Sequence, residues 1–203
     1  MSALKNLKFL LFVLAVFLSG CLPSAKEGTP QEVEGPLLVF LVRHAEKADN
    51  SMETDSRLTE EGILRAAELA RTLADAEINF VHSSDFIRTR NTASPLAGQL
   101  DLEIELYDTF DLHQLADTIK ARGGRHLVVG HSNTTPALVE ILGGQPGLPI
   151  VEATEYDRLY ILTIRNEEVS TVLLRYGKPF SSLPSSISAS SLEVPQTSGS
   201  ALN

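Results

Sequence analysis

The chain has 203 residues, of which 43% are hydrophobic, and carries a formal net charge of −9. This length suffices for one domain of ordinary size with additional segments at its ends, and the single cysteine excludes an intrachain disulfide. An acidic surface repels nucleic acid at long range, so we expect no nucleic-acid partner.

The first segment is a predicted targeting signal. Two lysines precede a short apolar run over residues 9–18, and small residues follow it. This order is typical of a signal peptide, and the run is too short for a membrane span. Leu18-Ser19-Gly20-Cys21 resembles a bacterial lipobox, which implies a signal peptide over residues 1–20, lipidation of Cys21 and a membrane anchor of acyl chains. The alternative is an ordinary secretory signal followed by an unrelated cysteine.

The segments around the predicted domain are expected to be flexible. Residues 21–36 contain proline, glycine and acidic side chains without an apolar period, which is typical of a tether. Residues 179–203 are rich in serine and hardly charged, so they cannot bury enough surface to order themselves, and we expect a disordered tail. The predicted folded domain therefore covers residues 37–178.

The domain begins with a predicted strand that ends in an arginine and a histidine. Residues 37–42 are an apolar run typical of a strand buried on both faces of a parallel sheet. Arg43 and His44 follow, at the edge where such sheets bind ligands. A guanidinium can hold phosphate oxygens and an imidazole can attack phosphorus. Alternatively, His44 caps the strand and Arg43 faces water. Residues 48–57 are expected to form a loop at the mouth of the crevice.

A scaffold helix is predicted after this loop. Thr59 is its expected cap, acidic residues follow in the first turn, and the helix extends to Leu73. Its apolar stripe is expected to cover one face of the sheet. The apolar positions of this stripe are residues 63, 66, 67, 70 and 73. A second strand is predicted over residues 78–82.

A second helix is predicted over residues 86–97, with its amino end at the crevice and a serine or aspartate as cap. Arg88 and Arg90 lie two residues apart and cannot share a helical face. We therefore expect one of them to reach the crevice and the other to be solvated, although both could be surface charges. Pro95 is expected to end or kink the helix.

The rest of the domain repeats the strand-to-histidine pattern. Residues 102–106 alternate like an edge strand, and residues 112–122 form a predicted helix that ends at glycines. An apolar strand then leads to Gly130 and His131, and a helix follows. Gly130 is expected to let the backbone approach a ligand closely. Residues 158–164 and 169–175 are predicted to form a hairpin that closes the sheet.

The motifs resemble those of the histidine phosphatase superfamily, also called phosphoglycerate-mutase-like, over about residues 37–175. The matching pieces are Leu41-Val42-Arg43-His44-Ala45-Glu46, Leu58-Thr59 with Gly62, Ser83-Ser84-Asp85-Phe86-Ile87-Arg88-Thr89-Arg90-Asn91-Thr92-Ala93, and Val129-Gly130-His131-Ser132-Asn133. The resemblance implies an α/β fold, a three-layer α/β/α sandwich with a mostly parallel central sheet. It also implies that His44 is the phosphorylated nucleophile.

The same resemblance implies a phosphate pocket made by Arg43, Arg88 and His131. Arg88 is preferred to Arg90 because the family's arginine precedes a small residue. Two arginines and a protonated His131 would supply the positive charge that phosphoryl transfer needs, so we expect no metal and no cofactor. The second ring nitrogen of His44 is expected to donate to a carbonyl.

The general acid is the weakest part of the motif. In some relatives an aspartate follows the second histidine, but Ser132 occupies that position here. In others the acid lies after the third strand, which points to Asp108 or Glu105. We favour Asp108, although either residue could be a solvated acid.

These inferences predict a metal-independent phosphomonoester hydrolase that is anchored to a membrane through Cys21. A small domain leaves a shallow, open crevice, which suits hydrolysis better than mutase chemistry. Its substrate is expected to be a phosphorylated small molecule, or a phosphorylated protein, glycan or lipid head group. The expected location is the cell envelope, as an exported bacterial lipoprotein on the periplasmic face of the inner or outer membrane. The alternative is a non-catalytic lipoprotein that keeps the pocket to bind phosphate or another anion.

Overall fold

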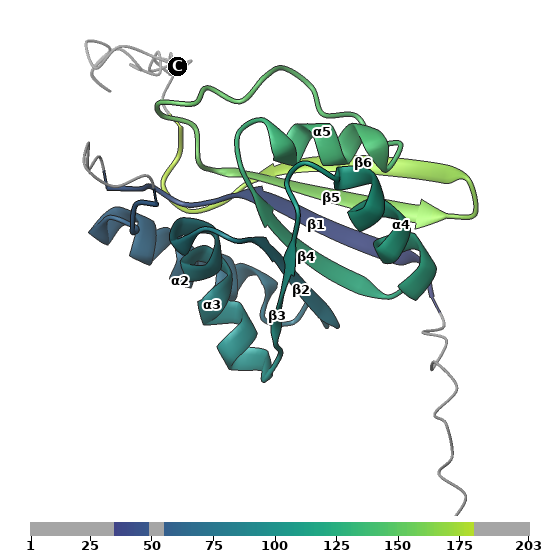
Figure 1. Cartoon of the computed structure of the whole chain (residues 1–203), viewed down its shortest axis with the longest axis horizontal. Helices are drawn as coiled ribbons and strands as arrows, with labels where there is room; N and C mark the ends of the chain where they lie inside the picture. The colour runs from purple at the N-terminus through teal and green to yellow at the C-terminus, as the bar shows by residue number, and fades with distance from the viewer. Residues whose placement is uncertain (1–34, 49–54, 181–203) are drawn as a thin grey trace, which may run out of the picture. The chain divides into compact units, whose positions relative to one another are not determined.

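The computed structural model describes residues 35–48 and 55–180, which contain a six-stranded sheet in the order β3-β2-β4-β1-β5-β6 (Figure 1). The predicted signal peptide, Cys21, most of the predicted tether, residues 49–54 of the predicted loop and the predicted tail from residue 181 lie outside the described residues. The elements are β1 (Leu37–Arg43), α2 (Glu60–Leu73), β2 (Phe80–Ser84), α3 (Ile87–Leu100), β3 (Ile104–Tyr107), α4 (Leu112–Arg122), β4 (Arg125–Gly130), α5 (Thr134–Ile141), β5 (Arg158–Arg165) and β6 (Glu168–Arg175).

The sheet is parallel over β3, β2, β4 and β1 and antiparallel over the β5–β6 hairpin. The register of β1 and β4 sets Arg43 opposite Gly130, and His44 N donates to Gly130 O at 2.9 Å. The residues that follow the two strands therefore meet at one edge of the sheet. The hairpin and the parallel sheet are as expected from the sequence.

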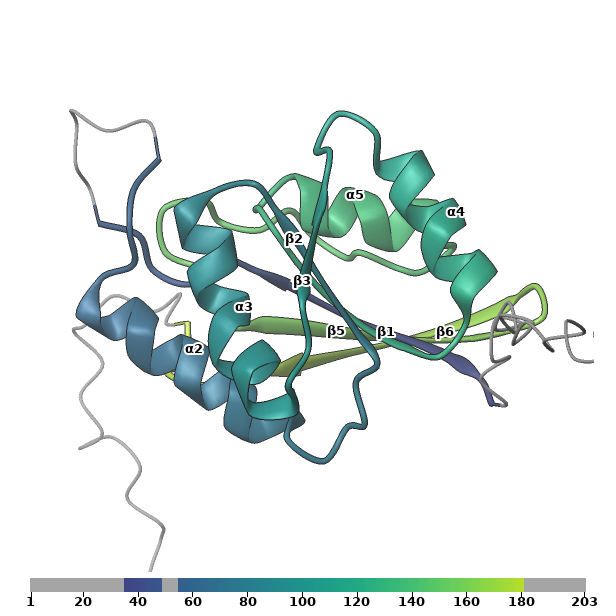
Figure 2. The same cartoon turned by 60° about the horizontal axis from the view of Figure 1, so that its bottom comes forward.

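Helices cover both faces of the sheet, which confirms the three-layer prediction (Figures 1 and 2). On β1, Val39 and Leu41 belong to the core under α4 and α5, whereas Phe40 and Val42 belong to the core under α2 and α3. Because both sets of side chains are buried, β1 has the unbroken apolar sequence of a central strand. Because β1 is a central strand of the sheet, Arg43 and His44 lie near the middle of the sheet edge at which the parallel strands have their carboxyl ends.

The helix α2 begins at its predicted cap, and its buried face is rotated from the predicted one: Ala66, Ala70 and Leu73 are buried as expected, whereas Ile63 and Ala67 are exposed. Thr59 Oγ1 accepts from Gly62 N at 3.0 Å. A Cβ atom on Gly62 would lie 2.2 Å from Glu46 O, so the first turn packs directly on the segment that follows His44. This contact sets the rotation of the helix: Ile63 is 59% exposed. The stripe buried on α2 is Gly62, Arg65, Ala66, Leu69, Ala70 and Leu73.

Two expectations about the β2–α3 unit are wrong. The strand lies two residues later than predicted, and no side-chain hydrogen bond caps the helix at Phe86. Instead, Asp55 Oδ1 accepts from Ile87 N at 2.8 Å, a contact between segments far apart in the sequence. Pro95 lies inside α3, which continues to Leu100, because the packed helix tolerates the loss of one backbone hydrogen bond.

Gly130 has a different role from the one predicted. A Cβ atom there would lie 2.8 Å from Thr134 Oγ1, 2.9 Å from Thr135 Oγ1 and 2.9 Å from Tyr107 Oη. The glycine therefore makes room for three hydroxyl groups of the protein itself, and the expected close approach of a ligand stays a prediction.

Two buried histidines lie side by side on neighbouring strands, His82 on β2 and His126 on β4. His82 Nε2 lies 2.9 Å from His126 Nδ1, and His126 Nε2 donates to Gly123 O at 2.8 Å. Each ring in this chain of hydrogen bonds carries one proton. Burial lowers the pKa of both imidazoles, to about 4 for His126, although Glu105 and Arg122 also face the pair.

Protonation of this pair is expected to destabilise the fold. The unfolded chain has ordinary histidine pKa values near 6.5 and so binds protons below that pH that the folded chain excludes. The stability contribution of the neutral pair is complete above pH 6.5 and is lost as the pH falls toward 4. Between pH 7 and 5.5 the free energy of unfolding in urea should fall by about 1 kcal/mol per imidazole. The variant His82→Gln should reduce this slope, and an unchanged free energy in the wild type would contradict the expectation.

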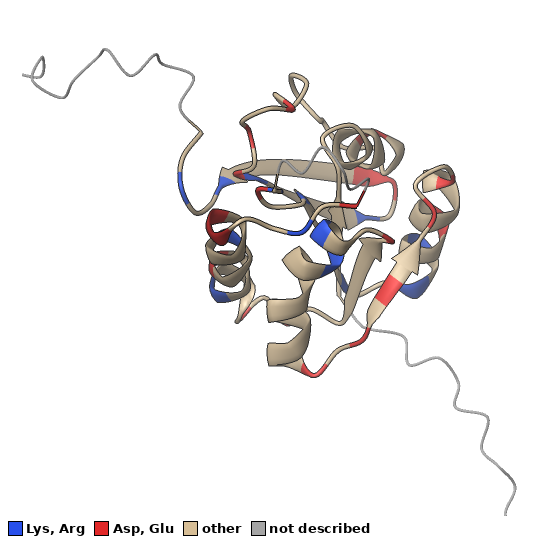
Figure 3. Cartoon of the chain, turned by 60° about the vertical axis from the view of Figure 1, so that its left-hand side comes forward, with Lys and Arg blue, Asp and Glu red and all other residues tan. Residues whose placement is uncertain are grey.

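Acidic and basic residues are interspersed along the described elements in the view of Figure 3. Within residues 35–48 and 55–180, no helix is long and apolar enough to span a bilayer. In the same ranges, no group of three or more His, Cys, Asp or Glu side chains is arranged to hold a metal ion.

Candidate active site

The structure brings His44 and His131 together at the carboxyl ends of β1 and β4. Their ring centroids are 5.4 Å apart and the rings are inclined by 67°. The side chain of His44 is 2% exposed, and its Nδ1 lies 2.7 Å from Ala45 O. Because a carbonyl oxygen can only accept, Nδ1 carries the proton and Nε2 keeps its lone pair. His44 therefore has the tautomer that a nucleophilic imidazole requires.

The tautomer of His131 is also fixed by its neighbours. Arg88 Nη2 lies 3.4 Å from His131 Nδ1, and His131 Nε2 lies 2.9 Å from Ser84 Oγ. Since an arginine can only donate, Nδ1 accepts and Nε2 donates to Ser84. Ser84 in turn donates to Thr89 Oγ1 at 3.0 Å. Sequence reasoning did not identify Ser84 as a partner of the second histidine.

Both imidazoles are neutral in the free pocket at neutral pH. Burial, with the neighbouring arginines, lowers the pKa of His44 to about 3 and that of His131 to about 4. The protonated His131 expected for phosphoryl transfer stays a prediction, because the imidazole is neutral before a phosphate binds. The cause is desolvation, which the sequence does not reveal. A phosphate dianion beside the ring would favour its protonated form.

Both predicted arginines lie near the two histidines, and Arg88 also lines the pocket beside them. Arg43 is 1% exposed, donates from Nη1 to Glu155 O at 3.0 Å, and its Cζ lies 4.1 Å from the Tyr156 ring centroid. Arg88 Cζ lies 4.3 Å from the Phe86 ring centroid. Within the described residues, Arg43 Nε and Arg88 Nε are buried donors without a hydrogen-bond partner. Buried donors of this kind suit an anionic ligand.

Arg90 takes the solvated role. It pairs with Asp85 at the surface, and its side chain is 37% exposed, against 14% for Arg88. Asp55 lies 3.7 Å from Arg88 and holds its guanidinium from the outer side. The placement agrees with the expectation that only one of the two arginines reaches the crevice.

The histidines line a pocket of about 520 Å³. Its rim is open to solvent, since Phe110 is 99% exposed. The described lining residues are His44, Lys47, Phe86, Arg88, Thr109, Phe110, His131, Ser132, Asn133, Thr134 and Glu152. The lining thus combines aromatic rings, cationic side chains and two imidazoles.

The structure does not bring Asp108, the predicted general acid, to the histidines. Its Oδ1 accepts from Phe110 N at 2.8 Å, and the residue lines a different hollow of about 140 Å³. The alternative residue, Glu105, pairs with Arg122 at 2.6 Å beside that same hollow. The carboxylate at the pocket is that of Glu152, which the sequence analysis missed because no motif or strand end marks it.

Glu152 lies on the loop between α5 and β5, and a buried ion pair holds this loop. Glu155 accepts from Val151 N at 2.9 Å and from Arg158 Nε at 2.6 Å. Arg158 also donates to Leu148 O at 2.6 Å. Burial alone would raise the pKa of Glu155, but hydrogen bonds from Arg158, Val151 N and Arg175 outweigh it and lower the pKa to about 2. The loop is therefore fixed from both sides of Glu152.

The segment after His44 is held by a second buried ion pair. Arg65 on α2 donates from Nε to both carboxylate oxygens of Glu46 at 3.0 Å. It also donates to Tyr176 O at 2.8 Å and to Lys178 O at 2.9 Å. This bidentate contact links the nucleophile segment to the end of the described domain.

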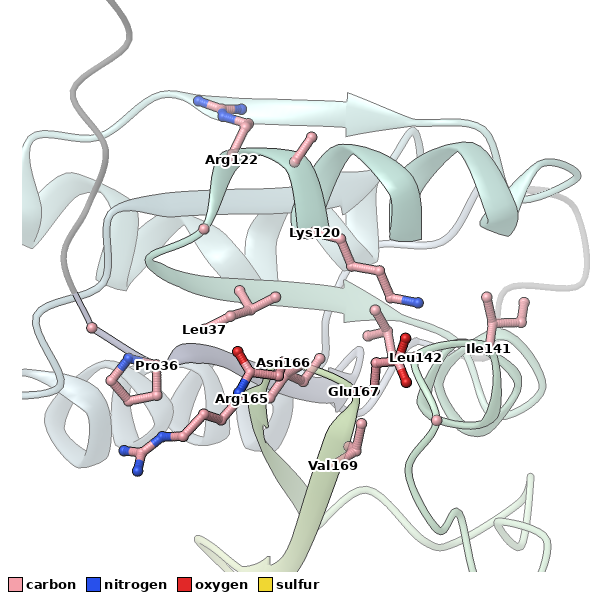
Figure 4. A pocket seen from close by; sticks show the side chains of 15 residues that line it. Pro36, Leu37, Lys120, Arg122, Ile141, Leu142, Arg165, Asn166, Glu167 and Val169 are labelled. Carbon is pink, nitrogen blue, oxygen red and sulfur yellow. The ribbon is translucent and has the colours of Figure 1, made fainter.

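A larger hollow of about 970 Å³ lies at the opposite end of β1, near Leu37 (Figure 4). Side chains from β1, α4, α5 and the β5–β6 turn line it, and none of them is a histidine, cysteine or aspartate. It shares no lining residue with the pocket of His44 and His131. The larger of these two hollows is therefore not the one that contains the paired histidines.

Comparisons with known proteins agree with this geometry. Residues 39–111 match the family model described as histidine phosphatase superfamily (branch 1). No curated protein matches the sequence. The protein histidine phosphatase SixA complexed with tungstate is similar at 20% identity and a TM-score of 0.55, over 68% of this chain and 97% of that chain.

Two further structures show the same fold. A putative phosphohistidine phosphatase SixA from Agrobacterium tumefaciens has 22% identity and a TM-score of 0.54, over 70% of this chain and 99% of that chain. Phosphoserine phosphatase from Entamoeba histolytica has 17% identity and a TM-score of 0.52, over 70% and 97% respectively. The chain thus shares the fold of these phosphatases, its residues 39–111 match the histidine phosphatase family model, and it has two paired histidines after β1 and β4.

Proposed function

We propose that this protein hydrolyses phosphomonoesters through a phosphohistidine on His44, without a metal. The observation that carries the proposal is the state of His44: its Nδ1–H is bound to Ala45 O at 2.7 Å, so the lone pair of Nε2 remains for attack. The ring lies in a pocket that also contains His131 and Arg88.

The surrounding donors suit a phosphoryl group in transfer. A loose transition state for phosphoryl transfer mainly requires that the reacting groups are positioned and that positively charged groups contact the equatorial oxygens. Arg43 and Arg88 have buried donors without a partner within the described residues, and these donors would bind the phosphoryl oxygens. His131, held by Ser84, would take up a proton beside the bound dianion. Two displacements at phosphorus, first by His44 and then by water, complete the hydrolysis.

The proposed substrates are phosphomonoesters with an exposed phosphate, either small molecules or phosphorylated proteins or glycans. Similar structures carry names such as protein histidine phosphatase, phosphoserine phosphatase and alpha-ribazole phosphatase, so phosphate groups on several kinds of carrier fit this fold. Phe110 at the open rim would contact the group that carries the phosphate.

The proposed location rests on the sequence before the domain. The lipobox-like residues that end at Cys21 would anchor the protein in the cell envelope through acyl chains. The substrate would then be a phosphorylated compound outside the cytoplasm.

The test is hydrolysis of an aryl phosphate by the purified full-length protein between pH 5 and 8, with a chelator present. We expect turnover that the chelator does not change, and acid-labile phosphate on the protein after a rapid quench. Turnover that needs an added metal would contradict metal independence. Phosphate binding without turnover at any pH would favour the alternative, a non-catalytic anion-binding lipoprotein.

A further inference from the structure

The carboxylate of Glu152 lies where a phosphate ester would enter the pocket. Its Oε1 is 3.1 Å from Arg43 Nη2, and its Oε2 accepts from the hydroxyl of Ser132, the residue after His131. The side chain is 65% exposed, so it reaches both solvent and the pocket. Of the described residues that line this pocket, Glu152 is the one with a carboxylate.

We propose that Glu152 is the general acid and base of this site, a proposal that rests on the proposed function. The Glu155–Arg158 ion pair fixes the loop, and Arg43 itself donates to Glu155 O at 3.0 Å. The phosphate-binding guanidinium and the carboxylate are thus held by the same loop. This positions Glu152 next to the phosphoryl oxygens and on the solvent side, where the leaving group departs.

Charged groups surround the carboxylate of Glu152. In the free pocket it faces the cations Arg43, Arg88 and Lys47 and the two neutral imidazoles. A bound phosphate dianion neutralises the cations and repels the carboxylate. The carboxyl group of Glu152 would then donate its proton to the ester oxygen that leaves beside it.

In this proposal Glu152 carries out the proton transfer in both displacements at phosphorus. In the first, the lone pair of His44 Nε2 attacks phosphorus, the P–O ester bond breaks, and the leaving oxygen takes the proton of Glu152. In the second, a water oxygen attacks phosphorus, the P–N bond breaks, and its electron pair returns to Nε2. The carboxylate of Glu152 takes the proton of that water, which restores the starting state.

The test compares the full-length Glu152→Gln variant with the full-length wild type. Each protein is assayed with two substrates, p-nitrophenyl phosphate and phenyl phosphate. Nitrophenolate is a good leaving group and needs no proton, whereas phenolate needs one. With phenyl phosphate we expect kcat to fall by about 10²–10³ without a burst, because the first step is slow. With p-nitrophenyl phosphate we expect a burst of about one product per protein, slow turnover and accumulation of acid-labile phosphate, because the second step lacks its base.

Glu140→Gln on α5 is the matched control, since the residue is exposed, lies outside the pocket lining and loses the same charge. It should behave as the wild type. Glu152→Asp keeps the carboxylate and should recover part of the phenyl phosphate rate. Normal turnover of both substrates by Glu152→Gln would overturn the proposal. A gain in rate would also overturn it, because it would show that the carboxylate competes with phosphate for the pocket. A wild type that neither turns over nor forms acid-labile phosphate would instead overturn the proposed function itself.

Discussion

The replacement His44→Ala is expected to abolish turnover of every phosphomonoester, with kcat lowered by at least about 10⁴. No other lone pair in the pocket occupies its place, because His131 donates from Nε2 to Ser84 and turns Nδ1 toward Arg88. Acid-labile phosphate should disappear from the protein at the same time. The measurements are steady-state hydrolysis and the yield of phosphoprotein after a rapid quench.

His113→Ala provides the control for this prediction, since His113 is exposed on α4 and away from the pocket. It should retain wild-type rates. Inorganic phosphate should still bind to His44→Ala, because Arg43 and Arg88 remain. A phosphoprotein that persists in His44→Ala would show that another residue is the nucleophile.

The replacement Arg88→Ala is expected to lower kcat/KM by about 10²–10³, the usual cost of removing one donor from a developing phosphoryl charge. Its guanidinium lies beside His131 and lines the pocket, and its Nε has no partner within the described residues. The measurement is kcat/KM for an aryl phosphate, together with inhibition by inorganic phosphate, which should weaken in parallel.

Arg90→Ala is the matched control for Arg88→Ala. The two arginines lie two positions apart on α3 and carry the same charge, but Arg90 pairs with Asp85 at the surface. Its loss should change kcat/KM by less than a factor of about two, as for other surface pairs. Equal losses in the two variants would mean that the site uses overall charge rather than a specific guanidinium.

Much of the fold was predictable because it depends on local patterns. The apolar run of β1 and the caps of α2 and α4 are visible in short stretches of sequence. The strand β3, by contrast, begins two residues later than predicted, and Leu106 is 54% exposed, so its burial does not follow the alternation of its sequence. What sequence could not reveal came from distant contacts. The rotation of α2 is set by Gly62 against Glu46 O, and the start of α3 is set by Asp55.

The candidate site was predictable to a similar extent. Arg43, His44, Arg88 and His131 follow strand ends or open a helix, and the structure brings them together, although their catalytic roles stay predictions. Glu152 has no such signal, because an ion pair between Glu155 and Arg158 positions its loop. The neutral state of His131 depends on burial, which no motif records. The proposed lipidation of Cys21 lies outside the described residues.

The contacts of Arg65 have a consequence for biosynthesis. One guanidinium joins Glu46, two residues after the nucleophile, to the carbonyl groups of Tyr176 and Lys178. On a ribosome, the first strand emerges long before those carbonyl groups have been made. The segment after His44 therefore gains this support only after the residues that follow β6 have been translated, so unfinished chains would lack the finished geometry around the proposed nucleophile.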